Sequence, residues 1–485
     1  MNISVIGTGY VGLVSGACLA ETGHRVTCVD IDAEKVEQIN RTEAPIYERG
    51  LDALLERNVG VGLTATQDLR AAVLDSTVSL IAVGTPFDGD RIDLRYVKTV
   101  ARQIGEVLRE KEGYHVVVVK STVVPGTTDD VVRPILEAAS GKTAGLDFGL
   151  GMNPEFLREG EAVDDFMHPD RIVLGGIDDR TLGVLEDMYA VFDGVEVVRT
   201  NTRTAEMIKY TANALLATLI SFSNEIGNLG AALGDIDVTE VMAGVHLDKR
   251  VSPILDNGTR IRPAITTYLE AGCGFGGSCF PKDVKALIAH GARVGTPMRI
   301  LESVVSVNSK QPAKMMELLR RRLPALQGTI VAVLGLAFKP GTDDLRESPA
   351  LPVVRALRDA GAHVRAYDPV ARHEAERLLG DTGITYAESL QDAIEDVDAV
   401  MLMTRWPEFT ALPSLLEASG ATPVVVDGRR MIAPDSVAHY EGIGAGGSKE
   451  ASPIEERLLD SMLGLLEARD QDDTRAQPSP VWAHA

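Results

Sequence analysis

NISVIGTGYVG, residues 2–12, is the stretch of sequence from which the fold can be predicted. A short apolar run ends at a G-x-G-x-x-G pattern made by Gly7, Gly9 and Gly12, and a helix-forming segment follows it. A strand, a glycine turn and a helix in this order are typical of a unit that holds a phosphate group at the amino end of the helix. The sequence therefore predicts the first strand, turn and helix of an α/β domain.

An acidic residue at the end of the next predicted strand completes a dinucleotide-binding pattern. Asp30, in HRVTCVDID, lies about 20 residues beyond the glycines. Its carboxylate would accept the ribose hydroxyls and repel a 2′-phosphate, which favours NAD over NADP. Gly7 would allow the tight turn, Gly9 the approach of the pyrophosphate and Gly12 the contact between helix and strand. A glycine turn without a ligand is the weaker alternative in this context.

Strands and helices continue to alternate along the chain. Apolar runs at 78–86 and 114–122 are separated by a helical pattern at 91–110, which predicts a parallel, doubly wound sheet. Residues 203–233 contain no proline and predict one long helix. At about 1.5 Å per residue this helix would span about 45 Å, enough to connect two domains. The segment up to residue 315 is also predicted to be helical around a glycine-rich loop.

The α/β pattern then starts again. GTIVAVLGLAFKPG (328–341) indicates a second strand, turn and helix start, and AHVRAYDP (362–369) a strand that ends in Asp. Residues 398–409 and 422–430 repeat the pattern of the third and fourth runs, so an internal duplication is expected. The predicted domains are an N-terminal NAD-binding Rossmann domain, a helical dimerisation domain with the glycine loop, a C-terminal Rossmann-like domain, and a terminal helix with a disordered tail: 1–200, 201–315, 316–450 and 451–485.

Composition limits the classes of partner. The 485 residues carry a formal net charge of −22, which argues against nucleic acid or an anionic membrane as the partner. Four cysteines in a spacing that fits neither a zinc site nor a disulfide scaffold predict no metal. The first residues read directly as a strand, with no signal-peptide pattern, and no apolar run reaches the roughly 18 residues of a membrane span. The cytoplasm is the expected compartment.

The most unusual segment is the glycine-rich loop GCGFGGSCFPKD, residues 272–283. Its glycines let the backbone approach a ligand and supply amides for an anion. Cys279 ends the loop, with Lys282 and Asp283 close behind, and a nearby cation would favour the nucleophilic thiolate. A buried structural cysteine is the alternative, and it is the interpretation for the other three cysteines: Cys18, Cys28 and Cys273.

Two further pairs of polar residues lie in otherwise apolar segments. Lys209 and Asn213 are four residues apart, so they share one face of the long predicted helix. Glu155 and Glu159 lie in NPEFLREG, residues 153–160. Alone, the lysine could reach past apolar neighbours to solvent, and the two acids could form a solvated helix start.

Together these motifs resemble those of the UDP-glucose/GDP-mannose dehydrogenases, most closely the UDP-glucose 6-dehydrogenases. The resemblance runs from Met1 to about residue 450 and rests on GTGYVGL, VGTP, KSTVVPGTT, NPEFLREG, EMIKYTANA, GFGGSCFPKD, GLAFKPGTDDLRESP and DGRR. It implies two Rossmann-like domains joined by a long helix and a helical middle domain, in a homodimer whose helix carries the subunit contact. It also implies oxidation of a sugar CH2OH to a carboxylate, with two NAD used in turn.

The resemblance implies roles for single residues. Cys279 is similar to the nucleophile. Glu155 and Thr122 are similar to the groups that activate and hold the hydrolytic water. The remaining implied catalytic residues surround the substrate oxygen: Lys209, Asn213 and Asp283. The implied cofactor contacts are Gly7, Gly9, Tyr10, Val11, Gly12, Asp30, Lys35, Thr85, Thr122, Glu159, Lys282 and Arg346. The implied substrate contacts are Glu155, Phe156, Leu157, Lys209, Asn213, Tyr268, Phe275, Gly276, Lys339, Arg429 (or Arg430) and, from the neighbouring subunit, Arg250.

Three questions stay open at the level of sequence. The segment between Arg250 and the glycine loop is longer than the family leads us to expect, and Glu270 stands where a basic or amide residue is more usual. UDP-glucose is the expected substrate, with dTDP-glucose, GDP-mannose or a UDP-N-acetylhexosamine as alternatives. A two-electron hydroxyacid dehydrogenase would not need Cys279 or DGRR, and an inactive nucleotide-sugar binder would not need the catalytic set.

Overall fold

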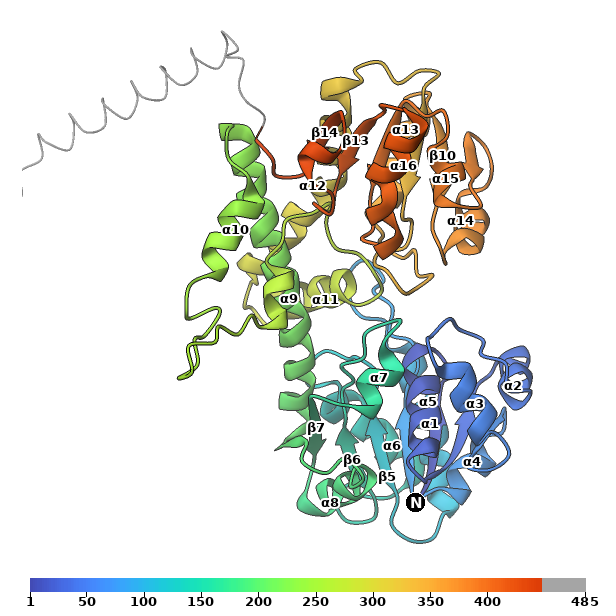
Figure 1. Ribbon diagram of the computed structural model, residues 1–485. Coiled ribbons are helices and arrows are strands. Elements are labelled where there is room, and N and C mark those ends of the chain that lie inside the picture. Colours follow the sequence, from blue (N-terminus) through green and yellow to red (C-terminus); the bar gives the residue numbers. More distant parts are fainter. Residues whose placement is uncertain (447–485) are drawn as a thin grey trace, which may run out of the picture.

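Two α/β sheets lie at opposite ends of the molecule and are joined by a helical middle region (Figure 1). The computed structural model describes residues 1–446. The terminal helix and tail predicted for 451–485 fall outside the described residues. None of the helices within the described range has the length and apolar character needed to cross a bilayer.

The N-terminal sheet has eight strands in the order β3-β2-β1-β4-β5-β6-β7-β8. Its strands are β1 (Asn2–Ile6), β2 (Arg25–Val29), β3 (Leu63–Thr66), β4 (Val78–Ile81), β5 (Val116–Val119), β6 (Gly149–Met152), β7 (Arg171–Gly176) and β8 (Glu196–Thr200). The helices around it are α1 (Tyr10–Glu21), α2 (Ala33–Asn40), α3 (Leu51–Asn58), α4 (Leu69–Asp75), α5 (Arg95–Glu110), α6 (Arg133–Ser140) with the π-turn η1 (Thr128–Val132), α7 (Ala162–Met167) and α8 (Asp179–Met188).

One strand pair departs from the predicted parallel sheet. β6 and β7 pair antiparallel, with Gly151 opposite Gly176 and Met152 opposite Gly175. An antiparallel partner must start at the edge where the previous strand ends. The connection through NPEFLREG and α7 therefore stays at the carboxyl edge of the sheet, which is the edge where ligands bind in open α/β sheets.

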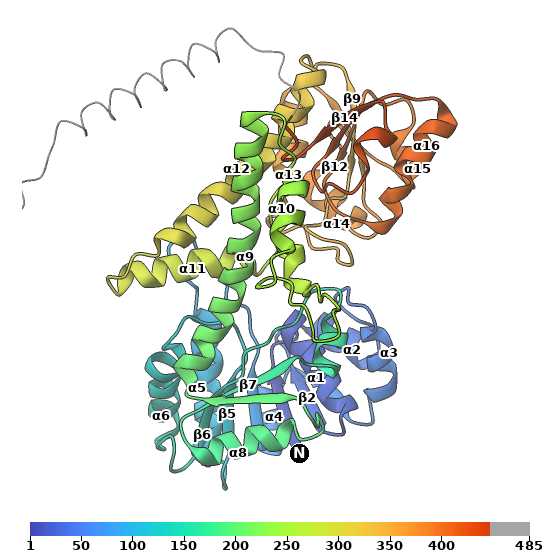
Figure 2. The same cartoon turned by 60° about the vertical axis from the view of Figure 1, so that its left-hand side comes forward.

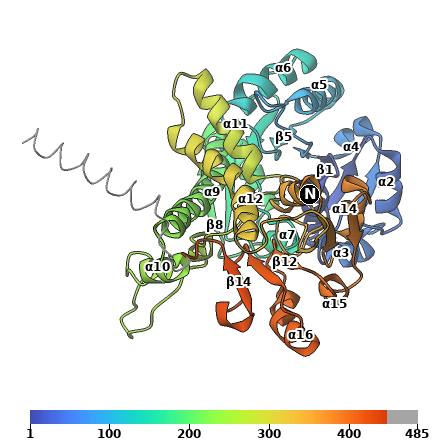
Figure 3. The same cartoon turned by 90° about the horizontal axis from the view of Figure 1, so that it is seen from above.

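The middle region is built on the predicted long helix. α9 (Thr202–Leu233) has 32 residues and begins at Asn201, whose side chain accepts a hydrogen bond from the Thr204 amide. α10 (Val238–His246), the 3-10 turn η2 (Ala264–Tyr268), α11 (Phe280–Arg293) and α12 (Arg299–Arg322) follow. α9 extends upward from the N-terminal sheet and contacts both α11 and α12 (Figure 2). α10 and the segment after it lie on the outer side of α9 (Figure 3).

The C-terminal sheet has the order β11-β10-β9-β12-β13-β14, which repeats the order of the first six strands of the N-terminal sheet. This topology confirms the predicted duplication. The strands are β9 (Ile330–Leu334), β10 (His363–Tyr367), β11 (Ile384–Tyr386), β12 (Ala399–Leu402), β13 (Val424–Asp427) and β14 (His439–Gly442). The helices and 3-10 turns are α13 (Ala350–Asp359), α14 (Arg372–Leu379), α15 (Leu390–Ile394), η3 (Pro407–Ala411), α16 (Leu412–Ser419) and η4 (Pro434–Ser436).

The first turn of the second unit differs from the prediction. No helix follows β9 directly, and residues 335–349 form a loop before α13 begins at Ala350. Pro340 and Pro349 lack the amide hydrogens that a helix interior needs, which is consistent with this loop. Asp368, the counterpart of Asp30, is buried and accepts hydrogen bonds from the amides of Leu336 and Ala337 at 2.7 and 3.0 Å.

At two positions of the first glycine turn, Gly7 and Gly12, the backbone leaves no room for a side chain or disfavours one. Gly7 adopts φ +101°, a left-handed conformation that side chains disfavour. A Cβ on Gly12 would lie 1.9 Å from the Gly7 carbonyl oxygen, whereas a Cβ on Gly9 would have no heavy atom within 4 Å. Gly12 therefore serves the packing of α1 on β1, and Gly9 faces open space.

We expect Gly12→Ala to destabilise the N-terminal domain by at least about 2 kcal/mol, because the new methyl group collides with backbone. Gly9→Ala is the matched control: Gly9 has φ −70°, which alanine tolerates, so folding should be preserved while dinucleotide binding weakens. Calorimetric unfolding and NAD titration separate the two effects. Equal melting of wild type and Gly12→Ala would contradict the predicted clash.

Candidate active site

The glycine turn and Asp30 form a site that fits a dinucleotide. Asp30 follows β2 and is half-buried, and its carboxylate accepts hydrogen bonds from the Thr8 amide at 2.8 Å and the Thr8 hydroxyl at 2.6 Å. Burial raises the pKa of Asp30, but these hydrogen bonds outweigh it, so the pKa is lowered and the group is anionic. Gly9 is exposed at the amino end of α1, where amides attract a pyrophosphate. The residues present therefore suit NAD.

The other predicted cofactor residues surround the same edge of the sheet. The Thr85 hydroxyl donates to the Thr122 carbonyl at 2.8 Å, which joins the segments after β4 and β5. The Tyr10 hydroxyl contacts Glu48 and accepts from the Gly160 amide at 2.8 Å. Val11 lies in the first turn of α1 and Lys35 near the start of α2.

Lys209 and Glu155 form a buried ion pair. Lys209 Nζ, on α9, lies 2.8 Å from Glu155 Oε1, in the loop after β6, and each side chain is only 4% exposed. The other carboxylate oxygen of Glu155 accepts from the Leu157 amide at 2.7 Å. Burial favours the neutral forms, but mutual attraction outweighs it: the pKa of Lys209 is raised and that of Glu155 is lowered. Both groups therefore carry their charge inside the protein.

Asn213 lies one turn further along α9 and reaches α11. Its amide donates to Asp283 Oδ2 at 2.6 Å, and Asp283 also contacts the Lys282 ammonium. The Asp283 side chain is 1% exposed. The predicted face of α9 is thus directed at the segment that follows Cys279, with Lys209 and Asn213 on the same side.

Cys279 is the N-cap residue of α11 and is partly exposed, unlike the other three cysteines, which are buried as predicted. Its thiol does not match the prediction of a favoured thiolate. Burial is the main reason that the pKa of Cys279 is raised to about 11. The Lys209 ammonium lowers this pKa, but the carboxylates of Glu155, Asp283 and Glu159 oppose that effect. The expected cation Lys282 is instead paired with Asp283.

A second cluster joins the N-terminal domain, the glycine loop and the C-terminal domain. Ser278 donates to Glu159 Oε1 at 2.7 Å, and Arg346 Nη2 lies 3.4 Å from the same oxygen. Arg346 is also paired with Asp344 at 2.8 Å. Burial and the charge of Asp344 raise the pKa of Glu159 to about 7. The predicted cofactor contacts Glu159 and Arg346 therefore meet beside Cys279.

The predicted substrate contacts lie on several segments of the N-terminal domain, the middle region and the C-terminal domain. Phe156 is stacked by Arg171, whose guanidinium lies 3.9 Å from the ring centre, and Phe275 is held by Asn308 at 2.8 Å. A Cβ on Gly276 would lie 2.3 Å from the Glu347 carbonyl oxygen, so the loop is pressed against the C-terminal domain. Further predicted contacts are Leu157 after β6, Tyr268 in η2, Lys339 after β9 and Arg429 after β13.

Two residues of the middle region lie apart from this cluster. Arg250 is 86% exposed and pairs with Asp248, so it contacts none of the catalytic set in the single chain. Glu270 pairs with Arg405 at 2.6 Å, and Arg405 also donates to the Arg429 carbonyl. The charge of Glu270 is therefore balanced by Arg405, next to Arg429, which is the predicted phosphate contact. Arg430 is not free for that role, because it is paired with Asp237.

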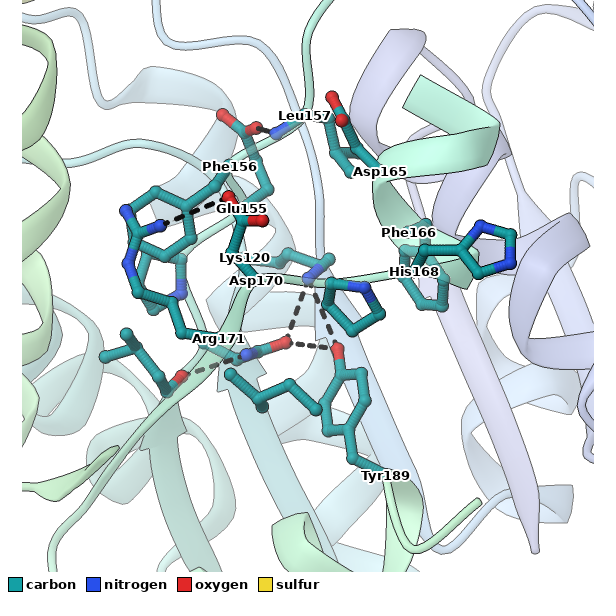
Figure 4. Close-up of a pocket in the computed structure, with 15 residues that line it drawn as sticks. Lys120, Glu155, Phe156, Leu157, Asp165, Phe166, His168, Asp170, Arg171 and Tyr189 are labelled. Atoms are coloured by element: carbon teal, nitrogen blue, oxygen red, sulfur yellow. Dashed lines mark hydrogen bonds and ion pairs between the residues drawn. The ribbon is translucent and has the colours of Figure 1, made fainter. Parts of the chain in front are cut away.

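Two buried charged residues next to the site were missed by the sequence analysis. Glu48 is 4% exposed and accepts from the Gly160 and Ala162 amides at 2.7 and 2.9 Å, which fixes the NPEFLREG loop to the N-terminal domain. Lys120 is 3% exposed and lies in the wall of a cavity next to Glu155 (Figure 4). A lysine directly after VVVV was the signal available for Lys120, since a buried strand end rarely carries an unneeded charge.

Comparison with protein families identifies the family of the chain. Three models of the UDP-glucose/GDP-mannose dehydrogenase family match: the NAD binding domain at residues 1–193, the central domain at 203–310 and the UDP binding domain at 332–434. The chain is 45% identical to UDP-glucose 6-dehydrogenase AglM of Haloferax volcanii over 448 residues, 91% of this chain and 100% of that protein. It is 42% identical to GDP-mannose 6-dehydrogenase of Pseudomonas aeruginosa over 408 residues, 83% and 89% of the two chains.

A solved structure agrees with the fold. A UDP-glucose dehydrogenase from the hyperthermophilic archaeon Pyrobaculum islandicum superposes with a TM-score of 0.83 and 41% identity, covering 92% of this chain and 98% of that one. The predicted fold class and the family resemblance are confirmed by these matches. The chain belongs to the UDP-glucose/GDP-mannose dehydrogenase family and is an NAD-dependent nucleotide-sugar 6-dehydrogenase.

Proposed function

We propose that this enzyme oxidises UDP-glucose to UDP-glucuronate through a covalent intermediate on Cys279. The observation that carries the proposal is the junction of Cys279, the Lys209–Glu155 ion pair and Asp283 at the meeting point of α9, α11 and the NPEFLREG loop. Conversion of CH2OH to a carboxylate removes four electrons, so two NAD are used per sugar. When bound, NAD supplies the hydride acceptor for each oxidation.

The first oxidation needs a group that stabilises charge on the sugar oxygen. Lys209 remains cationic although it is buried, and Asn213 and Asp283 border the same space. A cation held in a site that excludes water stabilises a developing oxyanion more strongly than it would in solution. Lys209 is therefore assigned to the substrate O6, with Asn213 and Asp283 as its neighbours.

The second half converts the aldehyde to the acid. The sulfur of Cys279 adds to the aldehyde carbon to give a thiohemiacetal, which becomes a thioester when it loses a hydride from carbon and the proton of its hydroxyl group. Water then attacks the acyl carbon, the carbon–sulfur bond breaks, and Glu155 accepts a proton from the water. Burial raises the pKa of Cys279 to about 11, so we assign the thiol as the attacking group, with its proton moving to the aldehyde oxygen as the carbon–sulfur bond forms.

UDP-glucose is favoured over the other nucleotide sugars by the relatives named for it, while the basic groups of the C-terminal domain suit the diphosphate that all of them share. Lys339 and Arg429 would contact the diphosphate. Burial lowers the pKa of Lys339, while nearby carboxylates including Glu161 and Glu159 oppose that effect. The Glu270–Arg405 pair would lie at the border of the nucleotide pocket. dTDP-glucose, GDP-mannose and UDP-N-acetylhexosamines remain the substrates to test against it.

A homodimer completes the proposal. Four apolar side chains of α9 are half-exposed, at 49–56%, and their spacing places them on one stripe: Leu215, Phe222, Leu229 and Leu233. An apolar stripe of this length on one helix is typical of a subunit interface. We assign it to a second copy of the chain, with Arg250 reaching the neighbour's substrate. The four free thiols suit the reducing cytoplasm.

We expect two NADH per UDP-glucose and no free aldehyde, measured by absorbance and by trapping with a carbonyl reagent. In a panel of nucleotide sugars, UDP-glucose should give the highest kcat/KM. Cys279→Ser should still bind substrate but lose the second half-reaction, since an alkoxide is harder to generate than a thiolate. One NADH per product in the wild-type enzyme would contradict the four-electron reaction.

Alkylation of Cys279 should report its raised pKa. In the cofactor-free enzyme, its rate with iodoacetamide should keep rising up to about pH 11. Lys209→Met should shift this profile to still higher pH, because the ammonium is the group that lowers the pKa. The peptide that contains Cys279 is followed by mass spectrometry, with buried Cys28 as the unreactive control. A plateau already below pH 8 would rule out the protonated resting thiol.

Arg250→Ala should raise KM for the nucleotide sugar by about tenfold or more, the effect of losing one charge-assisted hydrogen bond, and leave KM for NAD nearly unchanged. Lys249→Ala, one residue away, is the control. Light scattering on dilute enzyme should detect a dimer. A monomer with full activity would show that neither the α9 stripe nor Arg250 acts across subunits.

A further inference from the structure

A cavity on the side of the NPEFLREG loop is lined by Glu155 (Figure 4). Its inner wall includes Lys120, Asn153, Glu155 and Tyr189, and its mouth includes His168 and Asp170. The side chains at the mouth are 78% and 94% exposed, whereas Glu155 is 4% exposed. The cavity offers about 70 Å³ to the centres of water molecules, and one ordered water needs roughly 10–15 Å³.

The chemistry requires a route for water and protons at Glu155. Oxidation of CH2OH with one water and two NAD yields a carboxylate, two NADH and three protons. In the hydrolytic step the water oxygen bonds to the acyl carbon and the carbon–sulfur bond breaks. One water proton goes to Glu155, and the second passes from the product carboxylic acid to the departing thiolate, which leaves a carboxylate and the thiol of Cys279. Glu155 must pass its proton on before the next cycle, and its ion pair with Lys209 is almost closed to solvent.

Lys120 is the charged group in the inner wall beside Glu155. It follows β5, and its Nζ donates to Asn153 Oδ1 at 2.9 Å and to the Tyr189 hydroxyl at 3.4 Å. The Tyr189 hydroxyl in turn donates to Asn153 at 2.6 Å. Among residues 1–446 no carboxylate lies within 4.0 Å of the Lys120 ammonium. A buried cation held only by neutral groups is costly, and such positions are enriched in functional sites.

We propose that this cavity delivers the hydrolytic water and carries protons away from Glu155, and that Lys120 is a positioning residue that adds to Lys209 in keeping Glu155 ionised. This inference rests on the proposed thioester. The charge of Lys120 favours the ionised carboxylate that must accept a proton from water. Asn153 links the two, because it precedes Glu155 by two residues and is held by both Lys120 and Tyr189.

The surroundings of Lys120 make its charge dependent on pH. Burial lowers the pKa of Lys120 to about 8; Glu155 in the loop after β6 opposes this, and Lys209 on α9 adds to it. Tyr189 after α8 and the Phe166 ring of α7, 6.0 Å away, are its other close neighbours. The remaining charged or titratable groups that line the cavity are Asp165, His168, Asp170 and Arg171. Below about pH 8 the ammonium therefore supports ionised Glu155, and above it this support is lost.

The test compares Lys120→Met and Lys120→Arg in the complete enzyme with UDP-glucose and NAD. Lys120→Met should slow hydrolysis at least tenfold and accumulate an acyl adduct on Cys279, detected by intact-protein mass spectrometry in quenched turnover samples. Lys120→Arg keeps the charge, since a guanidinium does not lose its proton in this range, so the alkaline inflection of hydrolysis near pH 8 should disappear. Lys111→Met is the control.

Lys111 is matched because its ammonium is also held only by neutral groups, the carbonyls of Val73, Leu74 and Ser76, away from the catalytic set. Its loss should lower the melting temperature and leave the pH profile unchanged. An unaltered hydrolysis rate and profile in Lys120→Met overturn the proposal. If that variant does not fold, an unchanged alkaline inflection in Lys120→Arg overturns it. Absence of any adduct even in Glu155→Gln would instead reject the thioester itself.

Discussion

The buried ion pair between Lys209 and Glu155 is the interaction on which the site depends. It links the central helix to the loop at the carboxyl edge of the N-terminal sheet, with 2.8 Å between the charged atoms. Removing one partner of such a pair leaves an uncompensated charge, at a cost of about 3–5 kcal/mol. The pair therefore constrains the relative position of α9 and the NPEFLREG loop, in addition to the catalytic role proposed for it. Any variant at either residue changes both.

The other contacts of the site extend this constraint to the rest of the molecule. Asn213 joins α9 to α11 through Asp283, and Ser278 joins the glycine loop to Glu159. Arg346 then brings in the C-terminal domain. Four segments that are distant in sequence thus converge on one site: the NPEFLREG loop, α9, the glycine loop with the start of α11, and the segment that holds Arg346. The glycine loop can approach the C-terminal domain closely because Gly276 leaves no room for a side chain beside the Glu347 carbonyl.

The fold was largely predictable because its signals are local. The spacing of Gly7, Gly12 and Asp30 can be read directly from the sequence. The pattern then recurs, and the second sheet repeats the order of the first six strands of the N-terminal sheet. The antiparallel β6–β7 pair was not predictable, because strand direction depends on where the NPEFLREG connection lies. Likewise the pKa of Cys279 depends on burial and on three carboxylates brought there by other segments. Lys120 was not identified from the sequence, because its neighbours Asn153 and Glu155 follow a different strand and approach it only in the folded protein.

The two copies of the α/β unit have diverged at their acidic residues, and this has a kinetic consequence. Asp368 is buried and saturated by amides of its own domain, whereas Asp30 remains half-exposed at an open glycine turn. Of these two turns, only the first can receive a dinucleotide. Both oxidations must then use the same cofactor site. NADH from the first oxidation has to leave that site while the partly oxidised sugar stays bound. In the proposed mechanism, the covalent bond to Cys279 would hold the sugar in the site while one cofactor molecule replaces the other.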